Sequence, residues 1–315
     1  MKILIVTPAS QNSTKGNRVT ALRWSRILED LGNSVKIIIN YTNQSADILI
    51  ALHALKSISS ILNFRKKFPN RPLIITLTGT DLYRDIKENP EVLNTLEKAT
   101  RLIVLQPFAI NELPPKLQEI TTVIYQSNEV KVTSNQKKNG NFRICILGHL
   151  REVKNPFLAA RAAELLSEES KIVISHIGAA LTMDMEKNAL NENKSNPRYH
   201  WLGELPREEA LQILSDSHLL VHTSRLEGGA NAISEAISLG VPVISTEIQG
   251  SVGMLGKAYP GYFKNGDEKD LANILTKAEQ DTEYYQMLQD NCRILQPLFY
   301  PEREKESWSN LLEDI

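Results

Sequence analysis

Two glutamates eight residues apart, Glu227 and Glu235, are the side chains of this sequence best suited to bind a polyhydroxylated ligand. A carboxylate accepts two hydrogen bonds at once, so each glutamate is able to bind a vicinal diol. Between them come Gly228, Gly229, Ala230 and Asn231. The glycines allow close approach of the backbone, and a helix that begins here presents unpaired N–H groups to a diphosphate. A nucleotide sugar contains these groups: one diol on the ribose, one on the sugar, and a diphosphate between them.

The elements around this pair support the same interpretation. The apolar run His218–Thr223 predicts a buried strand, Ala230–Leu239 predicts a helix ended by Gly240, and Val241–Ser245 predicts the next strand. Taken alone, a helical glutamate is more often a solvated surface residue. The order strand, Glu, Gly-Gly, helix, Glu, strand favours the ligand-binding interpretation.

Cations follow another predicted strand, Phe142–Leu147, in the segment from Gly148 to Lys154. We expect Arg151 and Lys154 to stabilise the negative charge of a departing nucleoside diphosphate. The alternative is that both are surface charges. No Asp-x-Asp pair follows a predicted strand. We therefore expect no metal and no other cofactor, with the nucleotide sugar as co-substrate.

The first half of the chain offers a candidate anion site after the predicted strand Lys2–Val6. Lys15, Gly16, Asn17 and Arg18 stand at the start of a helix predicted at Asn17–Leu31, with Gly32 at its end. A helix N-terminus with nearby cations attracts an anion. The alternative is that these cations are solvated.

Two further candidates follow predicted strands of the first half. His53 comes after Ile48–Leu52 and is expected to transfer a proton or to orient a sugar hydroxyl, unless it is a satisfied histidine at the edge of the core. The strand predicted at Leu73–Leu77 is followed by Thr78, Gly79, Asp81 and Arg84, which we expect to line the ligand site. The alternative for Asp81 is a helix N-cap.

At 315 residues the chain is expected to form two domains. Strand and helix patterns alternate, with another strand predicted at Leu102–Leu105, and then restart after the polar segment Lys131–Asn141. The second half continues with predicted helices at Pro156–Leu166, Pro206–Leu214, Leu271–Ala278, Glu283–Leu295 and Glu302–Leu312, and a strand at Ile172–His176. We expect an α/β fold of two doubly wound Rossmann-like domains, 1–135 and 136–299, that face each other across a cleft, with 300–315 packing back on the first.

The composition excludes several classes of protein. A net charge of −1 argues against nucleic-acid binding, and no apolar run is long enough to cross a bilayer. We expect a cytoplasmic protein without stable membrane insertion, in which Cys145 and Cys292 are buried thiols. The cations near the end of the segment Leu55–Phe68 are expected to interact with a helix end rather than with a membrane.

The same motifs resemble those of retaining family 4 glycosyltransferases of the GT-B fold, through Glu227 and Glu235 and the segment from Gly148 to Lys154. That family has arginine where this chain has His149, so Arg151 is expected to replace one diphosphate contact. A further resemblance, to the selenosugar synthases of selenoneine biosynthesis (SenB type), runs along the whole chain. It is carried by GNRVTALRW, ALHALKS, LTGTDLYRD, VIYQS, GHLREVKNPF, EGGAN and GSVGMLG.

The resemblance implies transfer of a hexosyl group from UDP-N-acetylglucosamine or UDP-glucose to the selenium of selenophosphate. The cations Lys15, Arg18 and Arg84 would then bind the anionic acceptor, and His53 would orient it, because anionic selenium needs little help from a base. Two alternatives remain: an ordinary glycosyltransferase that makes an O-glycoside on a lipid, saccharide or small metabolite, and a silent protein that only binds nucleotide sugars.

Overall fold

The computed structural model describes residues 1–11, 13, 16–129 and 140–315, and these fall into two compact units. The first unit consists of Met1–Gln126, Glu227–Gly229 and Pro301–Ile315. The second consists of Ser127–Leu226 and Ala230–Tyr300. The predicted linker Lys131–Asn141 and residue Lys15 lie outside the described residues, except for Gly140 and Asn141.

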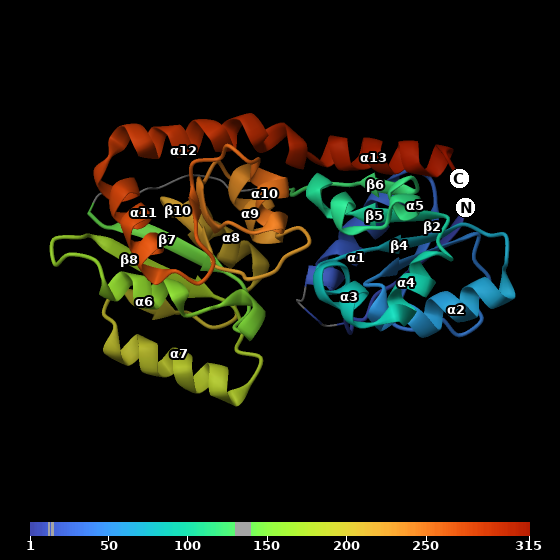
Figure 1. Ribbon diagram of the computed structural model, residues 1–315, viewed down its shortest axis with the longest axis horizontal. Coiled ribbons are helices and arrows are strands. Elements are labelled where there is room, and N and C mark those ends of the chain that lie inside the picture. Colours follow the sequence, from blue (N-terminus) through green and yellow to red (C-terminus); the bar gives the residue numbers. More distant parts are fainter. Residues whose placement is uncertain (12, 14–15, 130–139) are drawn as a thin grey trace. The chain divides into compact units, whose positions relative to one another are not determined.

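The described part of the first unit contains a six-stranded parallel sheet in the order β2-β1-β3-β4-β5-β6 (Figure 1). Its strands are β1 (Lys2–Val6), β2 (Ser34–Ile38), β3 (Ile48–Leu52), β4 (Leu73–Thr76), β5 (Arg101–Val104) and β6 (Thr121–Val123). Its helices are α1 (Gly16–Asp30), α2 (Ile58–Lys67), α3 (Ile86–Glu88), α4 (Pro90–Leu96), α5 (Pro115–Gln118) and α13 (Pro301–Glu313). The order reverses between β1 and β3, where ligands bind in sheets of this kind.

Both faces of this sheet are buried, as the uninterrupted apolar strands predict. Successive residues of β1 and β3 alternate between two cores. The core that contains Ile3, Ile5, Ile48 and Ile50 also holds Trp24 of α1 and Trp308 of α13. The opposite core contains Leu4, Val6, Leu49 and Ala51 with Phe64 of α2.

Helix α13 is anchored to α1 by an aromatic contact and a buried carboxylate. The rings of Trp24 and Trp308 meet edge to face, with centroids 4.8 Å apart. Glu304, whose side chain is fully buried, accepts a hydrogen bond of 2.6 Å from the Trp24 indole and forms a 2.9 Å ion pair with Arg23. These contacts make α13 part of the core of the first unit.

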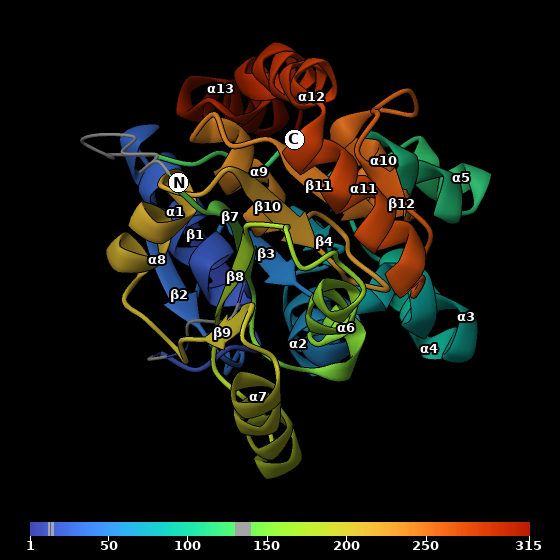
Figure 2. The same ribbon diagram turned by 90° about the vertical axis from the view of Figure 1, so that its left-hand side faces the viewer.

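The described part of the second unit also contains a six-stranded parallel sheet, in the order β12-β11-β10-β7-β8-β9 (Figure 2). Its strands are β7 (Phe142–Leu147), β8 (Ile172–Ile177), β9 (Tyr199–Trp201), β10 (Leu219–His222), β11 (Val243–Thr246) and β12 (Tyr262–Phe263). Its helices are α6 (Leu158–Glu164), α7 (Met183–Ser195), α8 (Arg207–Ser215), α9 (Asn231–Ser238), α10 (Gln249–Leu255), α11 (Glu268–Gln280) and α12 (Thr282–Leu295). The order reverses between β7 and β10.

The prediction of two doubly wound parallel sheets is confirmed. The helix ends predicted at Gly32 and Gly240 are also confirmed, because these glycines have φ of +83° and +70°, the conformation that commonly ends a helix. The sequence patterns did not predict β6, β9 and β12, which have three residues or fewer and lie at sheet edges. They also did not predict α3, α4, α5, α7 and α10. Helix α7 extends from the second unit and buries only Ala189 (Figures 1 and 2).

The cations of α2 bind backbone carbonyl groups of their own unit. Arg65 donates to the carbonyl oxygens of Pro69 and Lys98, both at 2.6 Å, and Lys67 donates to that of Asn43. These three carbonyl groups lie outside α2, so the expected interaction of the cations with a helix end stays a prediction. Among the described residues, no helix combines the length and the apolar character needed to cross a membrane.

Candidate active site

The loops that follow β7 and β10 are joined by hydrogen bonds at the point where the strand order reverses. The Thr223 hydroxyl donates to the Lys154 carbonyl at 2.9 Å, and the Arg225 N–H donates to the Val153 carbonyl at 2.8 Å. The sheet therefore holds the turn that carries Lys154 next to the segment that leads to Glu227. Lys154 is half-buried and Arg151 is exposed.

A buried histidine fixes the beginning of the first of these loops. His176 of β8 lies within hydrogen-bonding distance of the Gly148 carbonyl, at 3.1 Å through Nε2, and of the Tyr199 hydroxyl, at 2.7 Å through Nδ1. Because a carbonyl only accepts, Nε2 carries the proton and Nδ1 accepts from Tyr199. Burial lowers the pKa of His176 to about 4, so the ring is neutral at pH 7.

His149, which stands where the resembling family has arginine, is also held by the backbone. Its Nδ1 accepts a hydrogen bond of 3.1 Å from the Ala179 N–H. Gly178 is needed beside it, because an added Cβ would come within 2.1 Å of the Gly148 carbonyl oxygen. The loop from Gly148 to His149 is thus fixed from the side of β8.

Glu235 lies in α9 and is almost completely buried, with 3% of its surface exposed. It forms an ion pair with Arg207, the first residue of α8. The prediction placed Ala230 in the helix, whereas α9 begins at Asn231 and Ala230 precedes it in extended conformation. The Asn231 side-chain oxygen is buried and has no hydrogen-bond partner among the described residues.

The turn Glu227–Gly229 packs backbone against backbone on the Thr78–Gly79 turn. An added Cβ at Gly228 would lie 2.6 Å from the Thr78 carbonyl carbon, and one at Gly229 would lie 2.6 Å from the Leu105 Cβ. Both glycines are therefore required by close packing within the first unit. The predicted reason, room for a diphosphate, is not needed to explain them.

Asp81 organises this packing surface. One of its oxygens accepts from the N–H groups of Thr78 and Gly79, at 2.9 and 2.8 Å, and the other accepts from the Ala54 N–H at 2.9 Å. The alternative interpretation as a helix N-cap is wrong, because its carboxylate binds amides that precede it in the chain. Asp81 is fully buried and begins a short π-helical turn, Asp81–Asp85.

His53 lies at the end of β3 in a left-handed backbone conformation, with φ of +69°. Such a conformation is rare for residues other than glycine and is concentrated at functional sites. Its Nε2 lies 3.0 Å from the Thr80 hydroxyl, and its Nδ1 lies 3.8 Å from the Asp81 carboxylate. Burial lowers the pKa of His53, and the charge of Asp81 opposes that shift. His53, Thr78, Gly79 and Asp81 therefore form one cluster with Glu227–Gly229.

The predicted anion site at the start of α1 is only partly described. Gly16 begins the helix, and Asn17 and Arg18 follow it, while Lys15 lies outside the described residues. The Arg18 Nε is buried and has no hydrogen-bond partner among the described residues. Arg84, in contrast, forms an ion pair of 2.9 Å with Asp85, so its charge is already balanced locally.

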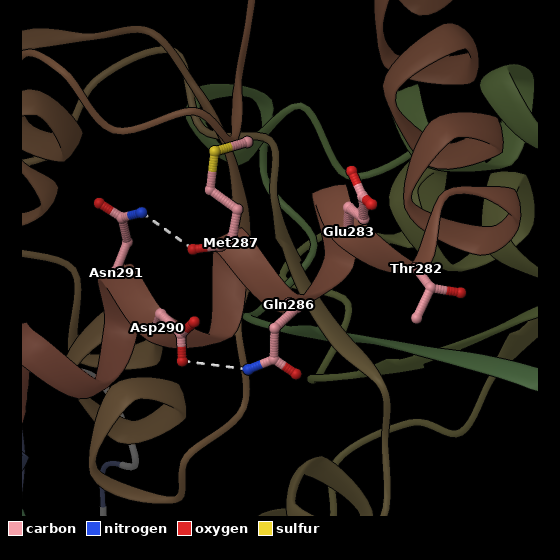
Figure 3. Close-up of a pocket in the computed structure, with 6 residues that line it drawn as sticks. All are labelled: Thr282, Glu283, Gln286, Met287, Asp290 and Asn291. Carbon is pink, nitrogen blue, oxygen red and sulfur yellow. Dashed lines mark hydrogen bonds between the residues drawn. The ribbon is translucent and has the colours of Figure 1, made fainter.

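A surface hollow lies elsewhere, along the exposed side of α12 (Figure 3). It is lined by Thr282, Glu283, Gln286, Met287, Asp290 and Asn291. None of these residues follows a strand of the sheet, and none belongs to the clusters described above. Both cysteines are buried and free, as predicted.

Three neighbours of the site were not predicted from the sequence: Arg207, Asn128 and His176. Arg207 did carry a signal, because a cation in the first turn of a helix is opposed by the helix dipole unless an anion is nearby. Asn128 follows the motif VIYQS directly and is buried. His176 carried no signal beyond its place in an apolar strand.

Residues 127–294, which include the loops after β7 and β10, match the family described as glycosyl transferases group 1. The chain belongs to this family. This group 1 glycosyltransferase is 26% identical over 285 residues to glycosyltransferase 1 domain-containing protein 1 of Xenopus tropicalis, covering 80% of each chain. It is 29% identical over 161 residues to an Escherichia coli UDP-Gal:α-D-GlcNAc-diphosphoundecaprenol α-1,3-galactosyltransferase, covering 50% of this chain and 41% of that one.

Solved structures define the fold of this glycosyltransferase. Anabaena HepE in complex with UDP matches with a TM-score of 0.80 and 17% identity, and in complex with UDP-glucose with a TM-score of 0.78 and 18% identity. Each match covers 100% of both chains. The predicted GT-B fold is confirmed.

Proposed function

We propose that this enzyme transfers a hexosyl group, N-acetylglucosamine or glucose, from the corresponding UDP-sugar to the selenium of selenophosphate. The observation that carries the donor assignment is the pair of hydrogen bonds that joins the loops after β7 and β10 at the point of strand reversal. Ligands bind at this point in open α/β sheets. HepE, which has the same fold, is known in complex with UDP-glucose.

In this proposal the donor interacts with residues around these loops. Arg151 and Lys154 neutralise the diphosphate, and Glu235 binds the ribose diol. Glu227 binds hydroxyl groups of the hexose. The unpartnered oxygen of Asn231 accepts a further hydrogen bond from the donor. Gly148, Gly228, Gly229 and Ala230 shape the backbone around the phosphates.

The proposed acceptor interacts with the first unit. Asn17 and the partly buried guanidinium of Arg18, with Lys15, would bind the phosphate oxygens of selenophosphate. Arg84 contributes less, because Asp85 balances its charge. Neutral His53 would orient the acceptor beside the Thr78–Gly79 turn. The motifs shared with selenosugar synthases support this choice of acceptor.

The chemistry balances without an added reactant. A selenium lone pair forms the bond to the anomeric carbon, and the bond from that carbon to the diphosphate oxygen breaks. The diphosphate leaves as UDP with the electron pair, stabilised by Lys154 and Arg151. Since the selenium is already anionic, no proton has to be removed from it.

The proposal is tested by incubating the enzyme with UDP-N-acetylglucosamine or UDP-glucose and selenophosphate, with thiophosphate and phosphate in parallel. Mass spectrometry should show a hexose that carries the selenium isotope pattern, together with UDP. Release of UDP at a rate that is independent of selenophosphate would refute the acceptor. Glycosylation of a lipid or saccharide hydroxyl in its place would favour the O-glycoside alternative, and absence of UDP binding would refute the donor.

A variant that removes one positive charge distinguishes the acceptor site from the donor site. Arg18→Ala should raise KM for selenophosphate at least about tenfold, because a charge-assisted hydrogen bond contributes more than a neutral one, and should leave KM for the UDP-sugar within about twofold. Arg26→Ala, at an exposed position on the same helix, is the matched control. If only the dependence on UDP-sugar changes in Arg18→Ala, the acceptor site is wrongly placed.

A further inference from the structure

Arg207 links the buried carboxylate of Glu235 to Asn128. One guanidinium nitrogen pairs with Glu235, and the other donates to the Asn128 side-chain oxygen at 3.3 Å. The side chain of Glu235 is 4% exposed, whereas that of Arg207 is 47% exposed. The arginine therefore reaches from the surface to the one carboxylate of α9.

Asn128 is itself fixed in orientation. Because a guanidinium only donates, the Asn128 oxygen must face Arg207, and its NH₂ group must face the Ser234 hydroxyl, at 2.8 Å. Ser234 in turn donates to the Asn231 carbonyl at 3.0 Å. The Asn128 backbone N–H donates to the Phe299 carbonyl at 3.2 Å. Asn128 is 6% exposed, so these hydrogen bonds have little competition from water.

The ion pair solves two electrostatic problems together. A buried carboxylate without a partner is costly, and a cation at the N-terminus of a helix is disfavoured by the helix dipole. In the ion pair, Arg207 neutralises the buried carboxylate of Glu235, and Glu235 offsets the unfavourable position of the arginine at the helix N-terminus. The hydrogen bond from Arg207 does not saturate Glu235, because a carboxylate has about four acceptor sites.

We propose that Arg207, held by Asn128, is a positioning residue that orients Glu235 toward the ribose diol of the donor and so sets the preference for a ribonucleotide. This inference rests on the proposed function, in which Glu235 binds the ribose. Arg207 itself need not touch the donor. Its removal should weaken binding of a ligand with both ribose hydroxyl groups more than binding of a ligand that lacks the 2′-hydroxyl.

The test measures binding of UDP and 2′-deoxy-UDP by isothermal titration calorimetry. The wild-type enzyme should bind UDP about tenfold or more tightly than 2′-deoxy-UDP. Arg207→Gln should weaken UDP binding about tenfold and change 2′-deoxy-UDP binding less than about threefold, so the preference is lost. In turnover, the KM for the UDP-sugar should rise while kcat stays within about threefold, as expected for a residue that acts on binding.

Two further variants exclude a general loss of structure. Asn128→Ala keeps the ion pair between Arg207 and Glu235 but removes the hydrogen bond that holds Arg207. It should reduce the preference for UDP over 2′-deoxy-UDP, by a smaller factor than Arg207→Gln does. In the Arg207→Gln background it should have little additional effect, because its influence passes through Arg207. Arg161→Ala is the matched control, since Arg161 pairs with Glu268 at 2.8 Å and its side chain is 42% exposed.

The outcomes separate this inference from the proposed function. If the wild-type enzyme does not bind UDP, the proposed donor is wrong. If it binds UDP but does not prefer it over 2′-deoxy-UDP, the role given to Glu235 and Arg207 is overturned. The inference is also overturned if Arg207→Gln retains the preference, or if it binds UDP more tightly, because the arginine would then compete with the ribose.

Discussion

Replacing Gly228 with alanine tests the packing of the turn that carries Glu227. The new Cβ would lie 2.6 Å from both the carbon and the oxygen of the Thr78 carbonyl, and 2.8 Å from the Gly79 nitrogen. These are backbone atoms, and Asp81 holds the amides of this turn at 2.8 to 2.9 Å. The contact cannot be relieved by rotation of a side chain. Overpacking of this kind costs about 1–3 kcal/mol.

Thermal unfolding and turnover should both respond to Gly228→Ala. A loss of about 1 kcal/mol lowers Tm by roughly 2–4 °C in a unit of about 150–250 residues, so a decrease of about 2–12 °C is expected. Glu227 is the adjacent residue, and its carboxylate should be displaced with the turn. Because misplacement by about 1 Å can reduce a rate about a hundredfold, kcat/KM should fall at least about tenfold.

Gly148→Ala is the matched control for this experiment. No atom lies within 4 Å of a Cβ added there, and Gly148 is not among the glycines with positive φ. Its Tm should therefore stay within about 2 °C of the wild-type value, whatever its effect on the donor. If Gly228→Ala unfolds at the wild-type temperature and retains full kcat/KM, the close packing of the turn is refuted.

Two other predictions concern stability. Glu304→Gln places an NH₂ group where the carboxylate faces Arg23. The free energy of unfolding, measured with urea, should therefore decrease by about 1–3 kcal/mol. A decrease below about 0.5 kcal/mol would contradict the buried ion pair. The folded pKa of His176, about 4, lies below its unfolded value of 6.5, so between these values the unfolded chain binds a proton that the folded chain excludes. The free energy of unfolding should therefore decrease as the pH is lowered from about 6.5 to about 4, by up to about 1.4 kcal/mol per pH unit. His176→Gln should show a shallower slope, and an equal slope would argue against a buried neutral ring.

Patterns that depend on neighbouring residues were sufficient to predict most of the fold. The apolar run of β3 is buried on both faces, so its bounds were predicted as the structure has them. Gly32 and Gly240 mark helix ends because each must adopt a positive φ. The edge strand β12 has two residues, too few for any periodic pattern to emerge.

Contacts between distant parts of the chain account for what the sequence could not predict. The pairing of Glu235 with Arg207 joins residues 28 positions apart, and the requirement for Gly228 comes from Thr78. Asp81 accepts hydrogen bonds from the amides of Ala54, Thr78 and Gly79, contacts that no local pattern in the sequence indicated. Residue types identified these side chains as important, whereas the fold decides what each of them touches.

The position of α13 has a consequence for biosynthesis. Trp24 is translated early, yet its partner Trp308 and the carboxylate of Glu304 follow only after the whole second unit has been made. Until then α13 is absent from one face of the first sheet, and the indole ring of Trp24 is not packed against Trp308. Domains usually fold in the order of their synthesis. In this protein the unit that is started first is therefore completed last, and a ribosome-bound chain stalled before Pro301 should be especially dependent on chaperones.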